Sequence, residues 1–196
     1  MDQEYRVLTV CTGNICRSPA AAAWLKALSD TSITVSSAGI RAVVGSGVQP
    51  YMANLMRQAG LPVDGFAARQ LTPGLIKEAD LVLAMTGEHR RWVVDRVPAA
   101  IRRTFTLVEL ARLAQLADAD ADARAAQVAV PDGAVKSSAQ RLAGIVAAVP
   151  SVRGRMHLGR GSGASIDVPD PYGRDEDVYN VAFALIRDAV KDLVGR

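Results

Sequence analysis

Short apolar runs alternate with amphipathic segments along most of this chain. Runs rich in aliphatic and β-branched residues predict four strands, at 5–10 (YRVLTV), 33–37, 79–85 and 104–107. Apolar residues at helical spacing, with capping residues at the ends, predict helices at 18–28, 49–59, 86–97, 108–116 and 175–194 and one that begins at 72–73. Strands that alternate with helices predict an α/β fold: a four-stranded parallel sheet with helices on both faces.

The stretch 117–166 breaks this alternation. It contains an amphipathic segment at 142–149 and a piece rich in Gly and Arg at 153–163. We interpret it as an insertion that holds one or two helices and a mobile basic loop. A chain of 196 residues without repeats fits one domain, so we expect a single domain over 1–196 with an insertion at about 117–166.

The net charge of +3 changes this interpretation little. The basic residues are dispersed and aromatic residues make up 5% of the chain, whereas a nucleic-acid-binding protein usually gathers its cations on one face. No apolar run reaches the ~20 residues of a membrane span, and the N-terminus is acidic where a secretory signal is basic. We therefore expect a cytoplasmic protein that binds no nucleic acid and has no membrane span.

Metal binding is not expected either. The spacing of Asp118, Asp120 and Asp122 imitates the start of a calcium loop, but Ala123 and Ala129 stand where that loop requires Gly and Glu. His89 is expected on the surface or in the first turn of a helix, without a catalytic role. We predict no cofactor.

The candidate chemistry lies in CTGNICRS at 11–18, between the first strand and a helix for which Ser18 is the expected N-cap. The backbone amides of such a loop can surround one anion. They also stabilise a thiolate at Cys11. Arg17 can hold two phosphate oxygens in a bidentate fork, so Cys11 is a candidate nucleophile for a bound phosphoryl group.

The proton for the leaving group needs a separate donor. Asp170 is the candidate, because it precedes Pro171 and Tyr172 in a turn just before the last helix, although Asp167 lies close to it. We expect Cys11, Arg17 and Asp170 to be catalytic. The expected substrate-binding residues are Thr12, Gly13, Asn14, Ile15, Cys16, Ser18 and Tyr172.

The string VCTGNICRSP at 10–19 resembles the low-molecular-weight protein tyrosine phosphatase family. The resemblance continues at 36–39 (SSAG), 68–71 (ARQL), 79–85 and 170–173 (DPYG), about three quarters of the chain, with 117–166 outside it. It implies a flavodoxin-like topology, a cysteinyl-phosphate intermediate on Cys11, phosphate binding by Arg17 and acid catalysis by Asp170.

The same resemblance assigns further roles in the loop. Asn14 and Ser18 match residues that shape the loop and hydrogen-bond the thiolate, with Ser37 behind them. Cys16 matches a cysteine that can form a reversible disulfide with the nucleophile, and Tyr172 matches an aromatic residue at the pocket rim. The chain departs from the pattern at Phe66, where many members have a histidine that bonds the loop asparagine, and at Gly173, where a second tyrosine is common.

Four functions fit the motifs to different degrees. The favoured one is hydrolysis of phosphotyrosine in proteins, with a tyrosine kinase as one candidate partner and a monomer as the expected state. A protein-arginine phosphatase shares the scaffold, but members of that branch usually carry Thr where Ile15 stands. An arsenate reductase needs resolving cysteines downstream, and no cysteine follows Cys16. A non-catalytic phosphate-binding module would not need Cys11, Arg17 and Asp170 together.

Overall fold

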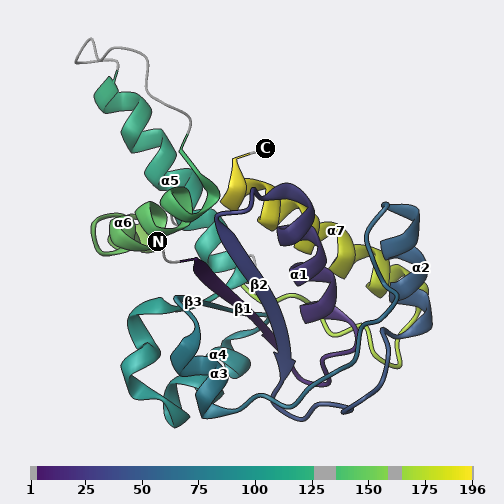
Figure 1. Cartoon of the computed structure of the whole chain (residues 1–196). Coiled ribbons are helices and arrows are strands. Elements are labelled where there is room, and N and C mark those ends of the chain that lie inside the picture. Colours follow the sequence, from purple (N-terminus) through teal and green to yellow (C-terminus); the bar gives the residue numbers. More distant parts are fainter. Residues whose placement is uncertain (1–3, 126–135, 159–164, 196) are drawn as a thin grey trace.

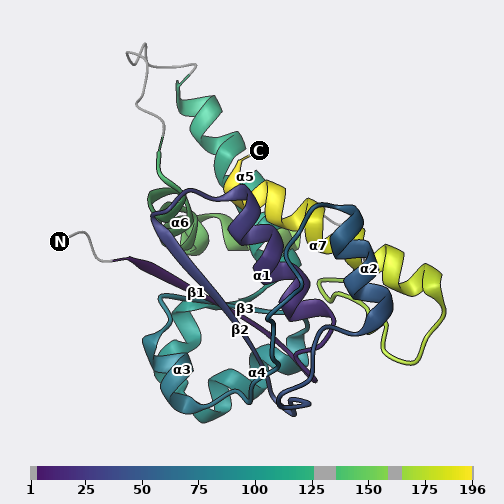
Figure 2. The ribbon, with the colours of Figure 1, turned by 45° about the vertical axis from the view of Figure 1, so that its right-hand side comes forward.

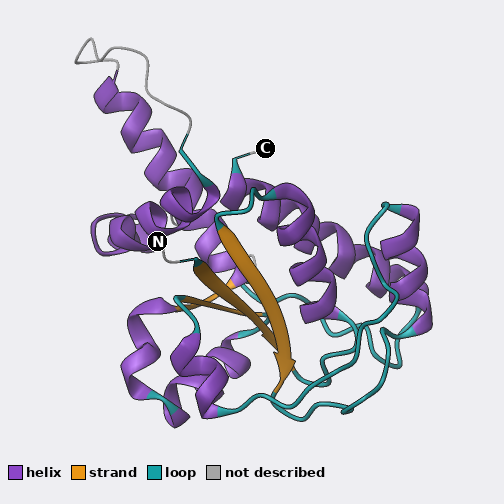
Figure 3. Ribbon diagram, in the orientation of Figure 1, coloured by secondary structure: helices purple, strands orange, loops and turns teal. Residues whose placement is uncertain are grey.

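The strands form one parallel sheet in the order β2-β1-β3-β4 (Figure 3). The computed structural model describes residues 4–125, 136–158 and 165–195, and of residues 120–125 and 153–158 it describes the backbone. The four strands are β1 (Tyr5–Cys11), β2 (Ile33–Gly39), β3 (Leu81–Ala84) and β4 (Thr104–Thr106). The predicted sheet is confirmed.

Side chains of the central strand β1 alternate between two apolar cores. Val7 and Cys11 pack with one set of helices, and Leu8 and Val10 pack with the other. Strands buried on both faces are typical of a parallel sheet, which explains why these segments are continuous apolar runs.

Helices cover both faces of the sheet, as predicted (Figure 1). Helices α1, α5 and α7 contribute to the larger core, and α3, α4 and the 3₁₀ helix η1 contribute to the smaller one. Figure 2 shows α7 beside α1, and α2 packs against the N-terminal part of α7. The helices are α1 (Arg17–Leu28), α2 (Pro50–Gln58), α3 (Pro73–Glu78), α4 (Gly87–Arg96), η1 (Pro98–Arg103), α5 (Leu107–Ala125), α6 (Ser138–Leu158) and α7 (Glu176–Val194).

The region 117–166 differs from the prediction in its helices. Helix α5 does not end near Leu116 but continues to Ala125, and α6 continues to Leu158, through part of the expected basic loop. The rest of that loop, 159–164, lies outside the described residues. Arg141 of α6 ties the region to the fold, because its guanidinium bonds the Asp118 carboxylate on α5 at 2.8 Å and the Leu193 carbonyl of α7 at 2.9 Å.

Helix starts agree with the sequence except at α1. The Thr72 and Thr86 hydroxyls accept hydrogen bonds from Leu75 N and His89 N, as expected of N-caps. Ser18, the expected cap of α1, lies inside the first turn, since the helix begins at Arg17. Its hydroxyl contacts Cys11 and Asn14 instead.

Candidate active site

The segment that follows β2 binds the backbone carbonyls of the loop between β1 and α1. Three backbone carbonyls of the loop, at residues 11, 12 and 13, accept hydrogen bonds of 3.0 Å from the amides of residues 40, 41 and 43, which follow β2. The Ile15 carbonyl accepts another, of 2.8 Å, from Gln49 N. With its carbonyls bonded to this outer segment, the loop leaves its N–H groups to face an anion.

Asn14 holds the loop in shape from within. It is fully buried and has φ 56°, in the left-handed region that Asn tolerates better than most residues. Its side-chain amide donates to Ser18 Oγ and Ser37 Oγ, both at 2.9 Å, and its Oδ1 accepts from Arg69 N at 2.9 Å. Both N–H bonds and the oxygen of this buried amide are therefore used to fix the loop.

The Cys11 sulfur lies at the base of the loop, where the end of β1 places it. Asn14 N donates to Cys11 Sγ at 3.3 Å, and Ser18 Oγ lies 3.0 Å from the same sulfur. The N-terminus of α1 also points its unpaired amides toward this end of the sheet. The sulfur is therefore surrounded by hydrogen-bonding groups of the loop.

Arg17 is buried, and its guanidinium is only partly satisfied. Nη1 donates to the Val168 carbonyl at 3.2 Å, and Nη2 donates to Thr12 Oγ1 at 3.4 Å and to Asp170 Oδ2 at 2.6 Å. Among the described residues, Arg17 Nε is buried without any hydrogen-bond partner. An unpaired buried donor is costly, so this N–H is available for an oxygen atom of a ligand.

The segment before α7 brings Asp170 to Arg17. Its side chain is 51% exposed and forms an ion pair with the guanidinium, whose own exposure is 4%. Asp167, the competing candidate, accepts a hydrogen bond of 2.7 Å from Gly87 N at the start of α4 instead. Of these two acidic side chains, Asp170 is therefore the one that faces the loop.

His89 belongs to this site although the sequence did not indicate it. It is 3% exposed, not on the surface, and its ring bridges two hydroxyls: Nε2 lies 2.9 Å from Thr12 Oγ1, and Nδ1 lies 2.8 Å from Thr86 Oγ1. Burial, and next the charge of Arg17, lower the pKa of His89 to about 4. The MTGEH string after the third predicted strand was the available signal, since α/β sites gather at the carboxyl ends of strands.

A pocket of about 200 Å³ opens above Cys11 and Arg17. Ile15, Val43 and Tyr172 form its apolar rim, and Tyr172 is 65% exposed. The structure thus brings together all the predicted catalytic residues and places all the predicted substrate-binding residues in or directly around this pocket except Asn14 and Ser18, which lie behind it.

Cys16 lines the same pocket but is chemically distinct from Cys11. Both thiols are free. Burial raises the pKa of Cys16 to about 12, and the neighbouring Cys11 adds to this shift. Cys16 therefore stays protonated at neutral pH.

Comparison with known proteins identifies the family of this chain. The family model for low molecular weight phosphotyrosine protein phosphatases matches residues 6–158. The chain belongs to this family. A probable low molecular weight protein-tyrosine-phosphatase, EpsP of Ralstonia solanacearum, is 39% identical over 104 residues, which are 53% of this chain and 71% of the relative. The predicted family is confirmed, and with it the enzyme class, a cysteine-dependent phosphatase.

Arginine phosphatases are also similar to this phosphatase. The protein-arginine-phosphatase of Geobacillus stearothermophilus is 41% identical over 103 residues, 53% of this chain and 69% of the relative. The solved structure of the YwlE arginine phosphatase from that organism superposes with a TM-score of 0.65 and 28% identity, covering 97% of this chain and 91% of that one.

Two further observations concern metal ions and membrane-spanning helices. Within the described ranges, no group of three or more His, Cys, Asp or Glu side chains is placed to hold a metal ion. None of the helices in the same ranges combines the length and the apolar character that crossing a bilayer requires.

Proposed function

We propose that this protein is a protein-tyrosine phosphatase that uses Cys11, Arg17 and Asp170 to hydrolyse phosphotyrosine. The observation that carries the proposal is the buried, unpartnered Nε of Arg17, a residue that lines the same pocket as Cys11. A phosphoryl oxygen bonded to that N–H would hold the phosphorus atom over the sulfur, in the geometry that nucleophilic attack requires.

The reaction proceeds in two displacements. The Cys11 thiolate attacks phosphorus, a P–S bond forms, and the P–O bond to the tyrosine ring breaks while Asp170 gives its proton to the leaving oxygen. A water molecule then attacks phosphorus, the P–S bond breaks, and Asp170 takes the proton of that water. The loop amides and Arg17 stabilise the negative charge on the phosphoryl oxygens in both steps.

Substrate binding requires the Arg17–Asp170 ion pair to be exchanged. At 2.6 Å, the Asp170 carboxylate occupies a donor that a bidentate phosphate would use. A dianionic phosphate competes for Arg17 and moves Asp170 toward the leaving oxygen. In that position the Asp170 carboxyl lies within reach of the oxygen that must receive a proton.

The pocket rim supports phosphotyrosine as the substrate. Ile15, Val43 and Tyr172 offer apolar contact to a flat ring, and they leave the phosphate to the polar base of the pocket. A phosphotyrosine-containing protein is therefore the expected partner, with a tyrosine kinase among the candidates. Phosphoarginine is the second candidate, favoured by the similarity to the protein-arginine-phosphatase of Geobacillus stearothermophilus.

Two assays test the proposal. Cys11→Ser is expected to abolish hydrolysis of p-nitrophenyl phosphate, whereas Cys16→Ser, a matched loss of one sulfur from the same loop, retains measurable turnover. Near-parental activity of Cys11→Ser would reject the mechanism. Comparing turnover of phosphotyrosine and phosphoarginine peptides decides the substrate, and faster release of phosphate from phosphoarginine would replace tyrosine by arginine.

Other sequence-based expectations stay predictions: a single domain with an insertion at about 117–166, a monomer, a cytoplasmic location, and a regulatory disulfide between Cys11 and Cys16. Analytical ultracentrifugation and mass spectrometry after mild oxidation test the state of assembly and the disulfide.

A further inference from the structure

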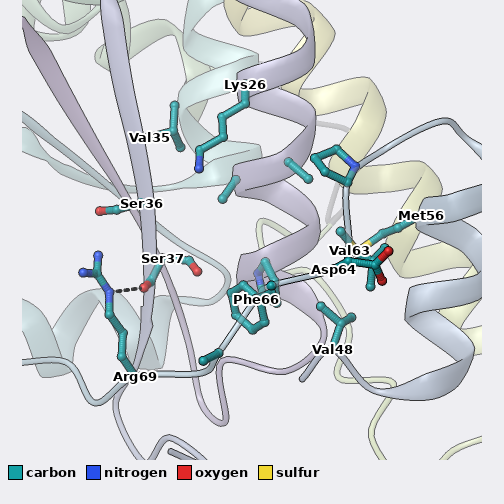
Figure 4. A pocket seen from close by; sticks show the side chains of 16 residues that line it. Lys26, Val35, Ser36, Ser37, Val48, Met56, Val63, Asp64, Phe66 and Arg69 are labelled. Atoms are coloured by element: carbon teal, nitrogen blue, oxygen red, sulfur yellow. Dashed lines mark hydrogen bonds between the residues drawn. The ribbon is translucent and has the colours of Figure 1, made fainter. Parts of the chain in front are cut away.

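A second, larger cavity lies behind the catalytic loop. Its volume is about 420 Å³, within the range of small-molecule sites. It opens between α1, the edge strand β2 and the segment 62–67 (Figure 4). Its walls are largely apolar, from Val35, Val48, Met56, Val63 and Phe66.

Two cations border this cavity, and neither has a carboxylate partner within the described part of the chain. Figure 4 shows the Lys26 side chain reaching from α1 toward β2, and Arg69 on the other side of Ser36. Among the residues that the structure describes, neither Lys26 nor Arg69 has an acidic oxygen within 4 Å. Asp64, the acidic residue of the lining, lies 3.7 Å from Arg57 instead. Apolar walls with two unpaired cations at one side suit an aromatic molecule that carries one negative group.

The cavity shares two residues with the network that shapes the catalytic loop. Ser37 and Arg69 line it, and both contact Asn14: Ser37 Oγ accepts from the Asn14 amide, and Arg69 N donates to Asn14 Oδ1, each at 2.9 Å. Arg69 Nε also donates to the Ser37 carbonyl at 2.8 Å, the dashed bond of Figure 4. Asn14 N in turn donates to the Cys11 sulfur.

We propose that this cavity binds a small aromatic anion, with its ring among Val48, Val63 and Phe66 and its charge between Lys26 and Arg69, and that binding alters the catalytic loop through Asn14. Binding of the anion depends on the cavity alone. Its effect on activity rests on the proposed phosphatase function, so binding and the effect on activity are measured separately.

Binding is tested by NMR titration of the full chain with 2-naphthoate and with its neutral counterpart 2-naphthamide. Saturating inorganic phosphate is present throughout, so that the catalytic pocket is occupied. We expect saturable shifts at amides of α1 and β2, at least tenfold weaker binding of 2-naphthamide, and at least fivefold weaker binding of 2-naphthoate to Lys26→Met. Lys77→Met, which removes an exposed lysine from α3 on the opposite face of the sheet, is the matched control and binds as the parent does.

Three results would each overturn the proposed site. They are equal binding of 2-naphthoate and 2-naphthamide, equal binding of 2-naphthoate to Lys26→Met and Lys77→Met, and no saturable shift at all. Coupling is then measured with p-nitrophenyl phosphate: 2-naphthoate should change kcat with KM nearly constant. A purely competitive effect would overturn the coupling, and absence of turnover in the parent would count against the proposed function while leaving the binding result intact.

Discussion

His89 and Thr12 meet across the two central strands, with 2.9 Å between His89 Nε2 and Thr12 Oγ1. Thr12 follows β1 and His89 follows β3, so the contact joins the two loops at the point where the chain reverses its direction through the sheet. Thr12 Oγ1 also accepts from Arg17, and Arg17 holds Asp170. One line of polar contacts therefore links a buried imidazole to the proposed acid.

The first prediction concerns acid stability. In the unfolded chain His89 titrates near its ordinary pKa of 6.5, whereas burial lowers it to about 4 in the folded protein, where it also faces Arg17, Asp170, Asp167 and Arg41. Between these values only the unfolded chain takes up the proton. The stabilisation is thus fully present above about pH 6.5 and is lost as the pH falls toward 4. At pH 4.5 the loss amounts to roughly 2–3 kcal/mol.

Urea unfolding of the parent and of His89→Asn at pH 7.0 and 4.5 measures this. The parent should lose more stability than the variant between the two pH values, by roughly 2–3 kcal/mol. His157→Asn, which replaces the other histidine of the chain, is the control and should follow the parent. Equal losses in all three proteins contradict the assignment.

The second prediction separates two roles of Asp170. Asp170→Asn should slow hydrolysis of phenyl phosphate, a poor leaving group, on the order of 10²-fold or more, and hydrolysis of p-nitrophenyl phosphate much less. The same change removes the carboxylate that competes for Arg17 Nη2. Inhibition by inorganic phosphate should therefore become tighter. Uniform losses across leaving groups remove Asp170 from the acid role, and weaker phosphate inhibition contradicts the exchange of the ion pair.

The third prediction concerns the two thiols. At pH 7.5 limited iodoacetamide should modify Cys11 and leave Cys16 intact, because the Cys16 pKa is raised to about 12. Phosphate should protect Cys11. Peptide mapping by mass spectrometry locates the label, and the protein unfolded in urea, which should take up two labels, is the control. Labelling of Cys16 before Cys11 would contradict the assignment.

The fourth prediction concerns Gly39, at the end of β2. A Cβ atom there would lie 2.5 Å from the Thr12 carbonyl oxygen and 3.0 Å from Asn14 N, both backbone atoms of the catalytic loop. Gly39→Ala should therefore lower the free energy of unfolding by about 2 kcal/mol or more and weaken phosphate binding. Gly47→Ala is the matched control, because a Cβ there meets nothing within 4 Å. Equal behaviour of the two variants would show that the loop tolerates the displacement.

The sheet and the loop were predictable because their signals are local. Four apolar runs between capped helices define the strands, and Cys11 to Ser18 carries a dense pattern of special residues at one strand end. The contact of His89 with Thr12 was not predictable, since the two residues lie 77 positions apart and pair only after the sheet forms. Helix α5 was predicted too short, because the alanine- and aspartate-rich sequence after Leu116 lacks a clear apolar stripe.

Three hydrogen bonds hold the segment that follows α6 against the carboxyl end of the sheet. Val168 N donates to the Met85 carbonyl at 2.8 Å, Thr106 Oγ1 donates to the Ile166 carbonyl at 2.9 Å, and Asp167 is held by Gly87. Two of these hydrogen bonds are made to Met85, directly after β3, and to Thr106 of β4, and the third is made to Gly87, the first residue of α4. Because the strand ends hold this segment close to Asp170, we expect a change in the length of the excursion between α5 and α6 to leave the acid in place.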